Sequence, residues 1–290
     1  MKSESDILVI GAPGNVGSYV VEYALERGMR IRIGAYDIEA AKASFEDVED
    51  ICFFDFYEPS TYESVFSGIE QVFFIRPPQI ADTKEGMIPA LRYAEKVGVE
   101  HMVFLSLFGI NRRMPHYDVE QFLKKSSMRY TFLRAGFFMQ NFSTQFLEDI
   151  RTRDEILVPA GKGKMALIDA RDIASVAVRS LANSSDDNRI FELTGSESLN
   201  YFDIAKIFTE VLGRPIDYPK PSPKEFKQKR LNQGWHSDMI EVLNMLFKMV
   251  RWRLAGKKSK DFEKLMERDP ITLEQFVIDH KHLWMKDMED

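Results

Sequence analysis

Three glycines, Gly11, Gly14 and Gly17, follow the apolar run 7–10 and open the helical pattern 16–27. In a strand–turn–helix of this kind, glycine allows a sharp turn and lets backbone N–H groups approach a pyrophosphate. The last glycine lets the helix pack against the sheet, with its positive end facing the phosphates. This spacing predicts a dinucleotide-binding turn, although loop glycines can also serve turn geometry alone. The expected cofactor contacts in the turn are Gly11, Pro13, Gly14, Asn15, Val16 and Gly17.

Asp37 lies 20 residues after Gly17, near the spacing at which a carboxylate binds the ribose diol of NAD. The same carboxylate would repel the 2′-phosphate of NADP. Lys42 and Arg32 could instead supply a positive charge. The chain is therefore expected to use NAD(P)H, with NAD versus NADP unresolved and NAD slightly favoured.

Two further groups of residues follow apolar runs, at the edge where parallel sheets bind ligands. Arg76 and Pro77 follow the run 72–75 beside the expected nicotinamide site and are expected cofactor contacts. Arg76 could face a cofactor phosphate or an acidic substrate, or be a solvated charge. The second group follows the run 130–133, and its amides could bind a substrate within an aromatic wall. Core packing is the alternative for Phe137. The expected substrate-binding residues are Phe137, Phe138, Gln140 and Asn141.

Short apolar runs alternate with helical patterns along the first two thirds of the chain. Strands that are apolar on both faces and alternate with helices indicate an α/β protein with a doubly wound parallel Rossmann sheet. Strands are expected at 7–10, 31–35, 51–54, 72–75, 102–105, 130–133 and 189–193. Helices are expected at 16–27, 60–66, 84–97, 119–125, 137–150 and 172–181.

The pattern changes after about Gly195. A helix is expected over 201–212, closed by Gly213, and prolines then punctuate a loop before further helical patterns. We therefore expect an NAD(P)-binding Rossmann domain at 1–195 and a smaller, mostly helical substrate-side domain at 196–290. The stretch 239–254 has more apolar residues than one buried helix stripe requires, which suits a substrate lid or a docking surface. A helix sandwiched on both sides within the C-terminal domain is the alternative.

Composition narrows the class of protein. The 290 residues carry a net charge of −6, which argues against general nucleic-acid binding, although 220–260 is locally basic. The single cysteine, Cys52, excludes a disulfide within the chain, so a cytoplasmic location is the default expectation. No apolar stretch reaches spanning length, no signal peptide is expected, and scattered histidines make no metal site.

Several segments together resemble the NmrA-like family, an atypical branch of the short-chain dehydrogenase/reductase superfamily. The segments are 11–17, 105–109, 130–141, 169–174, 191–195 and 272–276. This resemblance implies either an NAD(P)H-dependent reductase of quinones, azo dyes and related compounds, or a regulator that binds the cofactor without evident catalysis.

The resemblance also implies roles for particular residues. Ser106 stands where the family's serine sits, and His116 stands where members carry Lys or His. The Tyr-x-x-x-Lys pair of typical short-chain dehydrogenases is absent, since Arg112 precedes His116 by four residues and Tyr117 is out of register. His116, with Ser106, is the candidate catalytic residue, as a proton donor or a ligand of the nicotinamide ribose; a helix-cap or surface histidine is the alternative.

Three more cofactor contacts are implied by the resemblance. Tyr36 occupies the position of the arginine that pairs with the 2′-phosphate in NADP-preferring relatives. Asp55 and Phe56 follow the third strand where family members contact adenine; a strand-end turn is the alternative.

The function expected from the sequence is reduction of a small, aromatic or quinone-like acceptor by NAD(P)H. The main alternative is a non-catalytic NAD(P)-sensing regulator that acts through a protein partner. A sugar-nucleotide epimerase is disfavoured because Tyr-x-x-x-Lys is missing. The expected partner is a small-molecule acceptor, and the alternatives left open are a protein partner or a homo-oligomer. No nucleic-acid partner and no membrane-spanning segment are expected.

Overall fold

The computed structural model describes residues 6–286, which form two compact units. The first unit comprises residues 6–135 and 170–193, and the second comprises 136–169 and 194–286. The expected division into 1–195 and 196–290 therefore differs from the structure over 136–169. Apolar residues of that segment, such as Phe142, Ile150 and Leu157, belong to the hydrophobic core of the second unit.

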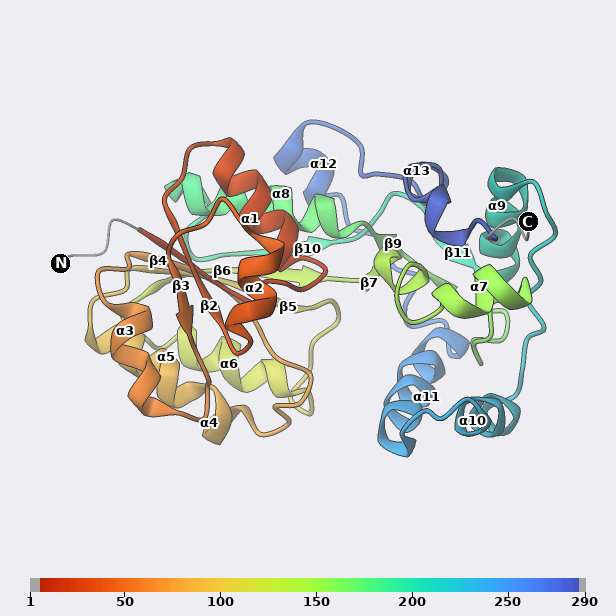
Figure 1. Cartoon of the computed structure of the whole chain (residues 1–290), viewed down its shortest axis with the longest axis horizontal. Coiled ribbons are helices and arrows are strands. Elements are labelled where there is room, and N and C mark those ends of the chain that lie inside the picture. Colours follow the sequence, from red (N-terminus) through yellow and green to blue (C-terminus); the bar gives the residue numbers. More distant parts are fainter. Residues whose placement is uncertain (1–5, 287–290) are drawn as a thin grey trace. The chain divides into compact units, whose positions relative to one another are not determined.

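The first unit is built on a seven-stranded sheet in which every neighbouring pair of strands is parallel. The order is β10-β6-β5-β4-β1-β2-β3, which confirms the doubly wound Rossmann sheet expected from the sequence (Figure 1). The strands are β1 (Ile7–Ile10), β2 (Ile31–Ala35), β3 (Ile51–Phe53), β4 (Gln71–Ile75), β5 (His101–Leu107), β6 (Arg129–Ala135) and β10 (Arg189–Leu193).

Helices cover both faces of this sheet. Helices α1 and α8 pack against each other on one face, and α3, α5 and α6 lie on the other (Figure 1). Both faces of the central strands are therefore covered, which explains their near-continuous apolar sequences. The helices are α1 (Gly17–Glu26), α2 (Ile38–Ser44), α3 (Tyr62–Phe66), α4 (Thr83–Gly86), α5 (Ile88–Lys96), α6 (Pro115–Leu123) and α8 (Ala170–Ala182).

Three helices of the first unit differ from the sequence-based expectation. The helix expected over 84–97 is interrupted at Met87, which separates α4 from α5. Helix α6 begins at Pro115, earlier than expected, because proline is well suited to a first helical position. Helix α2 was not expected; it begins because the Asp37 carboxylate accepts a hydrogen bond from the Ala40 N–H at 2.9 Å.

The second unit combines helices with two small sheets. Strand β8 (Lys164–Met165) pairs antiparallel with β11 (Leu199–Asn200), and β7 (Phe137–Phe138) pairs parallel with β9 (Leu167–Ile168). The helices are α7 (Leu147–Arg153), α9 (Tyr201–Leu212), α10 (Pro223–Asn232), α11 (Ser237–Arg251), α12 (Asp261–Met266) and α13 (Leu273–Asp279).

The prediction of a helix over 137–150 is wrong for the first half of that segment. Phe137 and Phe138 form β7, a 3₁₀ turn follows over Met139–Phe142, and the α-helix begins only at Leu147. Pairing with β9 decides this conformation, and a strand partner so distant in sequence is not visible from local periodicity.

Helix α9 agrees with the expectation at both ends. Asn200 and Asp203 form a capping box at its start, and Gly213 takes a left-handed conformation after its end. Helix α11 buries Ile240, Leu243, Phe247 and Val250 but leaves other apolar residues at the surface. The exposed ones are Met239, Val242 and Met245.

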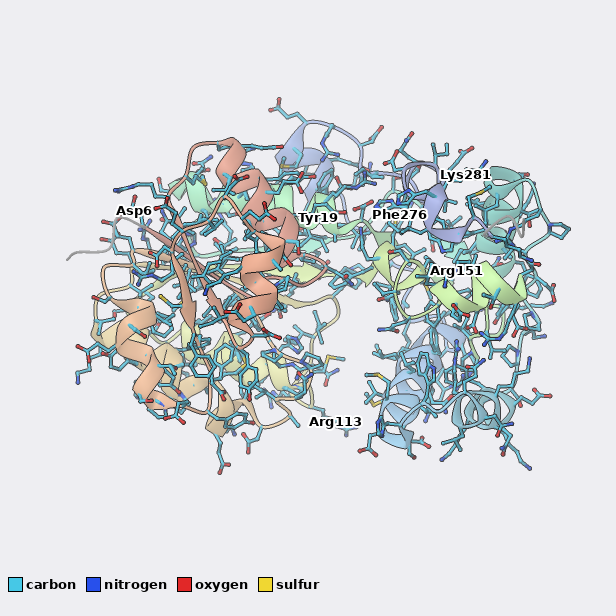
Figure 2. The ribbon with its side chains drawn as sticks, in the orientation of Figure 1. Asp6, Tyr19, Arg113, Arg151, Phe276 and Lys281 are labelled. Carbon is cyan, nitrogen blue, oxygen red and sulfur yellow. The ribbon has the colours of Figure 1, made fainter. Side chains whose placement is uncertain are left out.

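The core of the second unit is rich in aromatic side chains. Phe276 of α13 is fully buried in it, whereas Arg151 on α7 is partly exposed and pairs with Glu148 at 3.2 Å (Figure 2). The Trp284 indole donates to the carbonyl of Phe142 at 3.1 Å, tying the C-terminal part to the segment after β7.

Among the helices of residues 6–286, none has the length and apolar character needed to cross a bilayer.

Candidate functional site

The glycine turn joins β1 to α1 near the middle of the first unit's sheet. Gly11 has a φ of +111°, a conformation that favours glycine. A Cβ on Gly14 would lie 2.7 Å from the Gly11 carbonyl oxygen, and one on Gly17 would overlap the same atom. The turn is thus a cradle that side chains would fill, beside the N-terminus of α1. It fits a pyrophosphate.

The other turn residues offer different groups to a ligand. Pro13 and Asn15 are exposed, whereas Val16 is buried and precedes α1 as its N-cap residue.

Within residues 6–286, no group of three or more His, Cys, Asp or Glu side chains could hold a metal ion.

Strand β1 lies between β4 and β2, so the chain turns in opposite directions on its two sides. This is a topological switch point, where open parallel sheets bind ligands beyond their carboxyl ends. Tyr36, which follows β2, is 73% exposed, and its ring lies 5.8 Å from that of Phe53. Asp37 is also exposed while it caps α2. Both residues lie at the carboxyl edge of the sheet.

The two cations considered for the 2′-phosphate differ. Arg32 is buried, with its guanidinium bonded to both carboxylate oxygens of Asp50 at 3.0 Å and to three backbone carbonyls. Arg32 is therefore committed to the interior. Lys42 is exposed on α2 and pairs with Glu39 at 3.3 Å.

Asp55 and Phe56 form the turn after β3. One carboxylate oxygen of Asp55 accepts from the Tyr57 N–H at 2.9 Å. The Phe56 ring is in the hydrophobic core, and its carbonyl accepts the Tyr62 hydroxyl at 2.5 Å. Of the two side chains, only that of Asp55 offers a polar group at this edge.

Arg76, the residue directly after β4, and His116 of α6 form a partly buried side-chain pair. The Arg76 guanidinium donates to the carbonyls of Pro77, Pro78 and Ile80, at 3.0, 3.3 and 2.6 Å, and so folds the loop after β4. Its Nε donates to His116 Nε2 at 3.4 Å. His116 Nε2 is therefore an acceptor, and the ring proton belongs on Nδ1, which is buried without a partner among the described residues.

His116 is held in its neutral form. Burial, together with the nearby Arg76 charge, lowers the pKa of His116 to about 3. Its ring is stacked on Phe104, at 5.8 Å between centroids. His116 can thus donate a hydrogen bond from Nδ1, but it carries no ionised proton to deliver near neutral pH.

Ser106 is the penultimate residue of β5, near the carboxyl end of the strand, but its side chain is buried. It is 1% exposed, and its hydroxyl donates to Glu120 Oε1 at 2.7 Å. Arg134 holds the same carboxylate through two hydrogen bonds, at 3.0 and 2.6 Å. This network links β5, α6 and β6. Within it, the Ser106 hydroxyl proton is already used in the hydrogen bond to Glu120.

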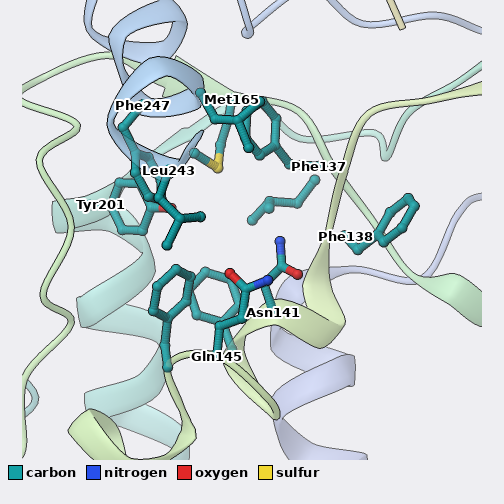
Figure 3. Close-up of a pocket in the computed structure, with 12 residues that line it drawn as sticks. Phe137, Phe138, Asn141, Gln145, Met165, Tyr201, Leu243 and Phe247 are labelled. Atoms are coloured by element: carbon teal, nitrogen blue, oxygen red, sulfur yellow. The ribbon is translucent and has the colours of Figure 1, made fainter. Parts of the chain in front are cut away.

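An aromatic pocket lies within the second unit, where its side chains line a cavity of about 60 Å³ (Figure 3). None of its lining side chains is charged, and its polar groups come from two amides and a tyrosine. The lining residues are Phe137, Phe138, Asn141, Phe142, Gln145, Phe146, Met165, Leu167, Tyr201, Leu243, Leu246 and Phe247.

The four expected substrate residues separate into two groups. Phe137, Phe138 and Asn141 line the aromatic pocket. Gln140 does not, because its side chain is buried and donates to Asp169 Oδ1 at 2.9 Å. The prediction that Gln140 contacts a substrate is therefore not retained.

A family model matches residues 3–277, which is nearly the whole chain, and it describes the NmrA-like family. The chain belongs to the NmrA-like family. The resemblance noted in the sequence is thereby confirmed.

Relatives of this NmrA-like protein match along most of its length. It is 29% identical to the NAD(P)H azoreductase of Xenophilus azovorans over 252 residues, covering 84% of this chain and 87% of that one. The triphenylmethane reductase of Citrobacter sp., complexed with NADP(H), has a TM-score of 0.85 at 21% identity, covering 95% and 99%. The NADPH-dependent quinone oxidoreductase of Escherichia coli, complexed with NADPH, has a TM-score of 0.84 at 20% identity, with the same coverage.

Sequence reasoning missed part of the pocket of this NmrA-like protein. Tyr201 is distant in sequence from the segment 137–141, and as the first residue of α9 it could be expected only in a helix. Leu243, Leu246 and Phe247 belong to α11, whose excess of apolar residues was the one signal available.

Proposed function

We propose that this NmrA-like protein is an NAD(P)H-dependent reductase of an aromatic or quinone-like acceptor. One observation carries the proposal: the same chain has a glycine cradle at a topological switch point and an uncharged, aromatic-lined pocket. The azoreductase relative, which acts with NAD(P)H, supports the same class of reaction.

The cofactor would be held by the glycine turn at its pyrophosphate and by the carboxyl edge of β2 and β3 at its adenosine half. Tyr36, Asp37 and Asp55 are the exposed or partly exposed side chains there. When bound, NAD(P)H supplies a hydride. The slight preference for NAD is not supported by the comparisons, since both structural neighbours described above are complexes with NADP(H) or NADPH.

His116 would hold the cofactor rather than deliver a proton, because its ring is neutral and Nδ1 carries the proton. Arg76 would orient that ring. Ser106 is left out of the acceptor contacts, since its hydroxyl is buried and donates to Glu120. A quinone can take its proton from water, so the missing tyrosine does not argue against this reaction.

The acceptor would occupy the aromatic pocket, where flat rings pack well against phenylalanine side chains. The cavity itself, about 60 Å³, is smaller than most small-molecule sites, so the lining side chains would have to move apart to admit an acceptor. The alternative, a non-catalytic NAD(P) sensor, is not favoured, because the azoreductase, the triphenylmethane reductase and the quinone oxidoreductase are all described as redox enzymes.

The test is NAD(P)H oxidation with a panel of quinones and azo dyes. We expect turnover of at least one of them, and slower turnover when Leu243→Trp fills the pocket. Trp substitution at the exposed Val242, next to it on α11, is the matched control and should leave the rate unchanged. Tight cofactor binding with no turnover of any acceptor would favour the sensor.

A further inference from the structure

Tyr201 places a hydroxyl in the wall of the aromatic pocket. The residue is 2% exposed, and its ring is packed among those of Phe142, Tyr218 and Phe247, at 5.3 to 6.4 Å. Its hydroxyl has no hydrogen-bond partner among residues 6–286. Because Tyr201 lines the pocket and this hydroxyl is not among the fully buried polar atoms that lack a partner, it is available to hydrogen-bond a bound molecule.

The neighbouring tyrosine shows what a structural hydroxyl looks like in the same core. Tyr218 is also buried, but its hydroxyl donates to the carbonyl of Gly161 at 3.1 Å. Tyr218 does not line the aromatic pocket, whereas Tyr201 does. The difference between the two residues is therefore access to the pocket.

The remaining polar groups of the pocket come from one short segment. Asn141 and Gln145 present their carboxamides to the space from below, while Tyr201 lies beside Leu243 and Phe247 (Figure 3). Asn141 is partly buried and Gln145 is exposed, so Asn141 is the more desolvated of the two amides. A bound molecule would meet hydrogen-bonding groups from α9 and from the segment after β7, and apolar side chains elsewhere.

We propose that the Tyr201 hydroxyl and the Asn141 carboxamide bind an oxygen of the acceptor, and that they select carbonyl-bearing aromatic molecules over oxygen-free ones of the same shape. This inference rests on the proposed function for the identity of the pocket's ligand. Burial, with Tyr218 nearby, raises the pKa of Tyr201 well above its usual value, so the hydroxyl remains a donor throughout the physiological range. A site that hydrogen-bonds a ligand discriminates against the analogue that lacks the polar group.

The experiment compares menadione, which has two carbonyl oxygens, with methylnaphthalene, which has the same ring system and none. Equilibrium dialysis would give their affinities for the full-length protein and for Tyr201→Phe, Asn141→Ala and Tyr218→Phe. Tyr201→Phe should weaken menadione binding by roughly 3- to 10-fold, as expected for one lost hydrogen bond, and leave methylnaphthalene binding unchanged. Asn141→Ala should act in the same direction.

Tyr218→Phe is the matched control and should change neither affinity, because its hydroxyl is bound to the backbone outside the pocket. Equal affinity of Tyr201→Phe and the unmodified protein for menadione would overturn the proposal, as would failure of the unmodified protein to bind menadione. Turnover is measured on the same samples. Unchanged binding with retained turnover therefore rejects the role of Tyr201 alone, whereas Tyr201-dependent binding without turnover rejects the reductase.

Discussion

The pair formed by Arg76 and His116 determines what chemistry is available beside the glycine turn. Arg76 donates to Nε2 of the ring, and its charge adds to the effect of burial on the pKa of His116. A histidine at this position would be expected to titrate near neutrality if it were exposed. Here the ring is neutral, with one N–H to offer a ligand.

The first prediction concerns this neutral ring. With the pKa of His116 at about 3, the reductase rate should show no inflection near pH 6.5 that depends on His116. His116→Gln, which preserves an N–H donor, should keep more activity than His116→Ala. Rate profiles between about pH 5 and pH 8 check this. An inflection near neutrality that disappears in His116→Gln would show that the ring ionises during turnover.

The second prediction concerns Asp37, whose charge and helix cap can be separated. Asp37→Asn removes the negative charge while its side-chain oxygen can still accept from the Ala40 N–H. Because the charge would repel a 2′-phosphate, NADPH affinity should rise relative to NADH affinity in this variant. Calorimetric titration measures both. An unchanged ratio of NADPH to NADH affinity would mean that Asp37 does not contact the adenosine ribose of the cofactor.

At the scale of elements, the β1–turn–α1 unit works because no side chain fits where strand and helix meet. The clash at Gly14 is with the backbone of Gly11, which cannot move aside as a flexible side chain would. The sequence predicted this element well, since strand, glycines and helix are contiguous. It did not predict β7, because that strand depends on a partner some thirty residues away.

The third prediction follows for the glycine turn. Gly14→Ala should weaken binding of both NADH and NADPH by more than tenfold, because the new methyl group forces the cradle to shift. Gly213→Ala is the control: it strains a left-handed helix end in the second unit, so it should lower Tm without changing cofactor affinity. Cofactor affinity unchanged in Gly14→Ala would remove the turn from the binding site.

The fourth prediction concerns α10, which is anchored to α7 by a buried ion pair. Arg230 is 2% exposed, donates to Asp149 at 2.5 Å, and lies over the Trp235 ring at 4.4 Å. Arg230→Met removes one partner of this pair and should cost about 3 kcal/mol. All three tryptophans lie in the second unit, so tryptophan fluorescence during urea unfolding reports this loss. Arg153 also donates to Asp149, at 2.9 Å. A cost near zero would show that Arg153 alone compensates Asp149.

At the scale of the whole molecule, most of the sheet could be predicted because each central strand is short, apolar and followed by a helix. The division into units could not be predicted in full. The chain crosses to the second unit at 136, returns for α8 and β10, and leaves again at 194. The local amino-acid composition gives no sign that residues 170–193 rejoin the first unit. The aromatic pocket draws on four separate segments for the same reason, so the sequence predicted individual lining residues only in the first of them.

The fifth prediction concerns acid stability, which buried histidines of the first unit should limit. Burial lowers the pKa of His101 to about 4, whereas an unfolded histidine titrates at about 6.5. Stability is therefore complete above about pH 6.5 and falls as the unfolded chain takes up protons below it, by about 2 kcal/mol at pH 5 for this residue. His101→Gln should flatten the dependence of unfolding free energy on pH. An unchanged slope would contradict the assignment.

The central claim, hydride transfer from NAD(P)H to an aromatic acceptor, is tested most directly with cofactor deuterated at the transferable hydrogen. Single-turnover reduction of an active quinone or azo dye should proceed more slowly with the deuterated cofactor, and the oxidised cofactor should have lost the label. Gly14→Ala, tested at the same cofactor concentration, should show little reaction. Cofactor that stays reduced and labelled beside every acceptor, in protein shown to bind both, would contradict the account.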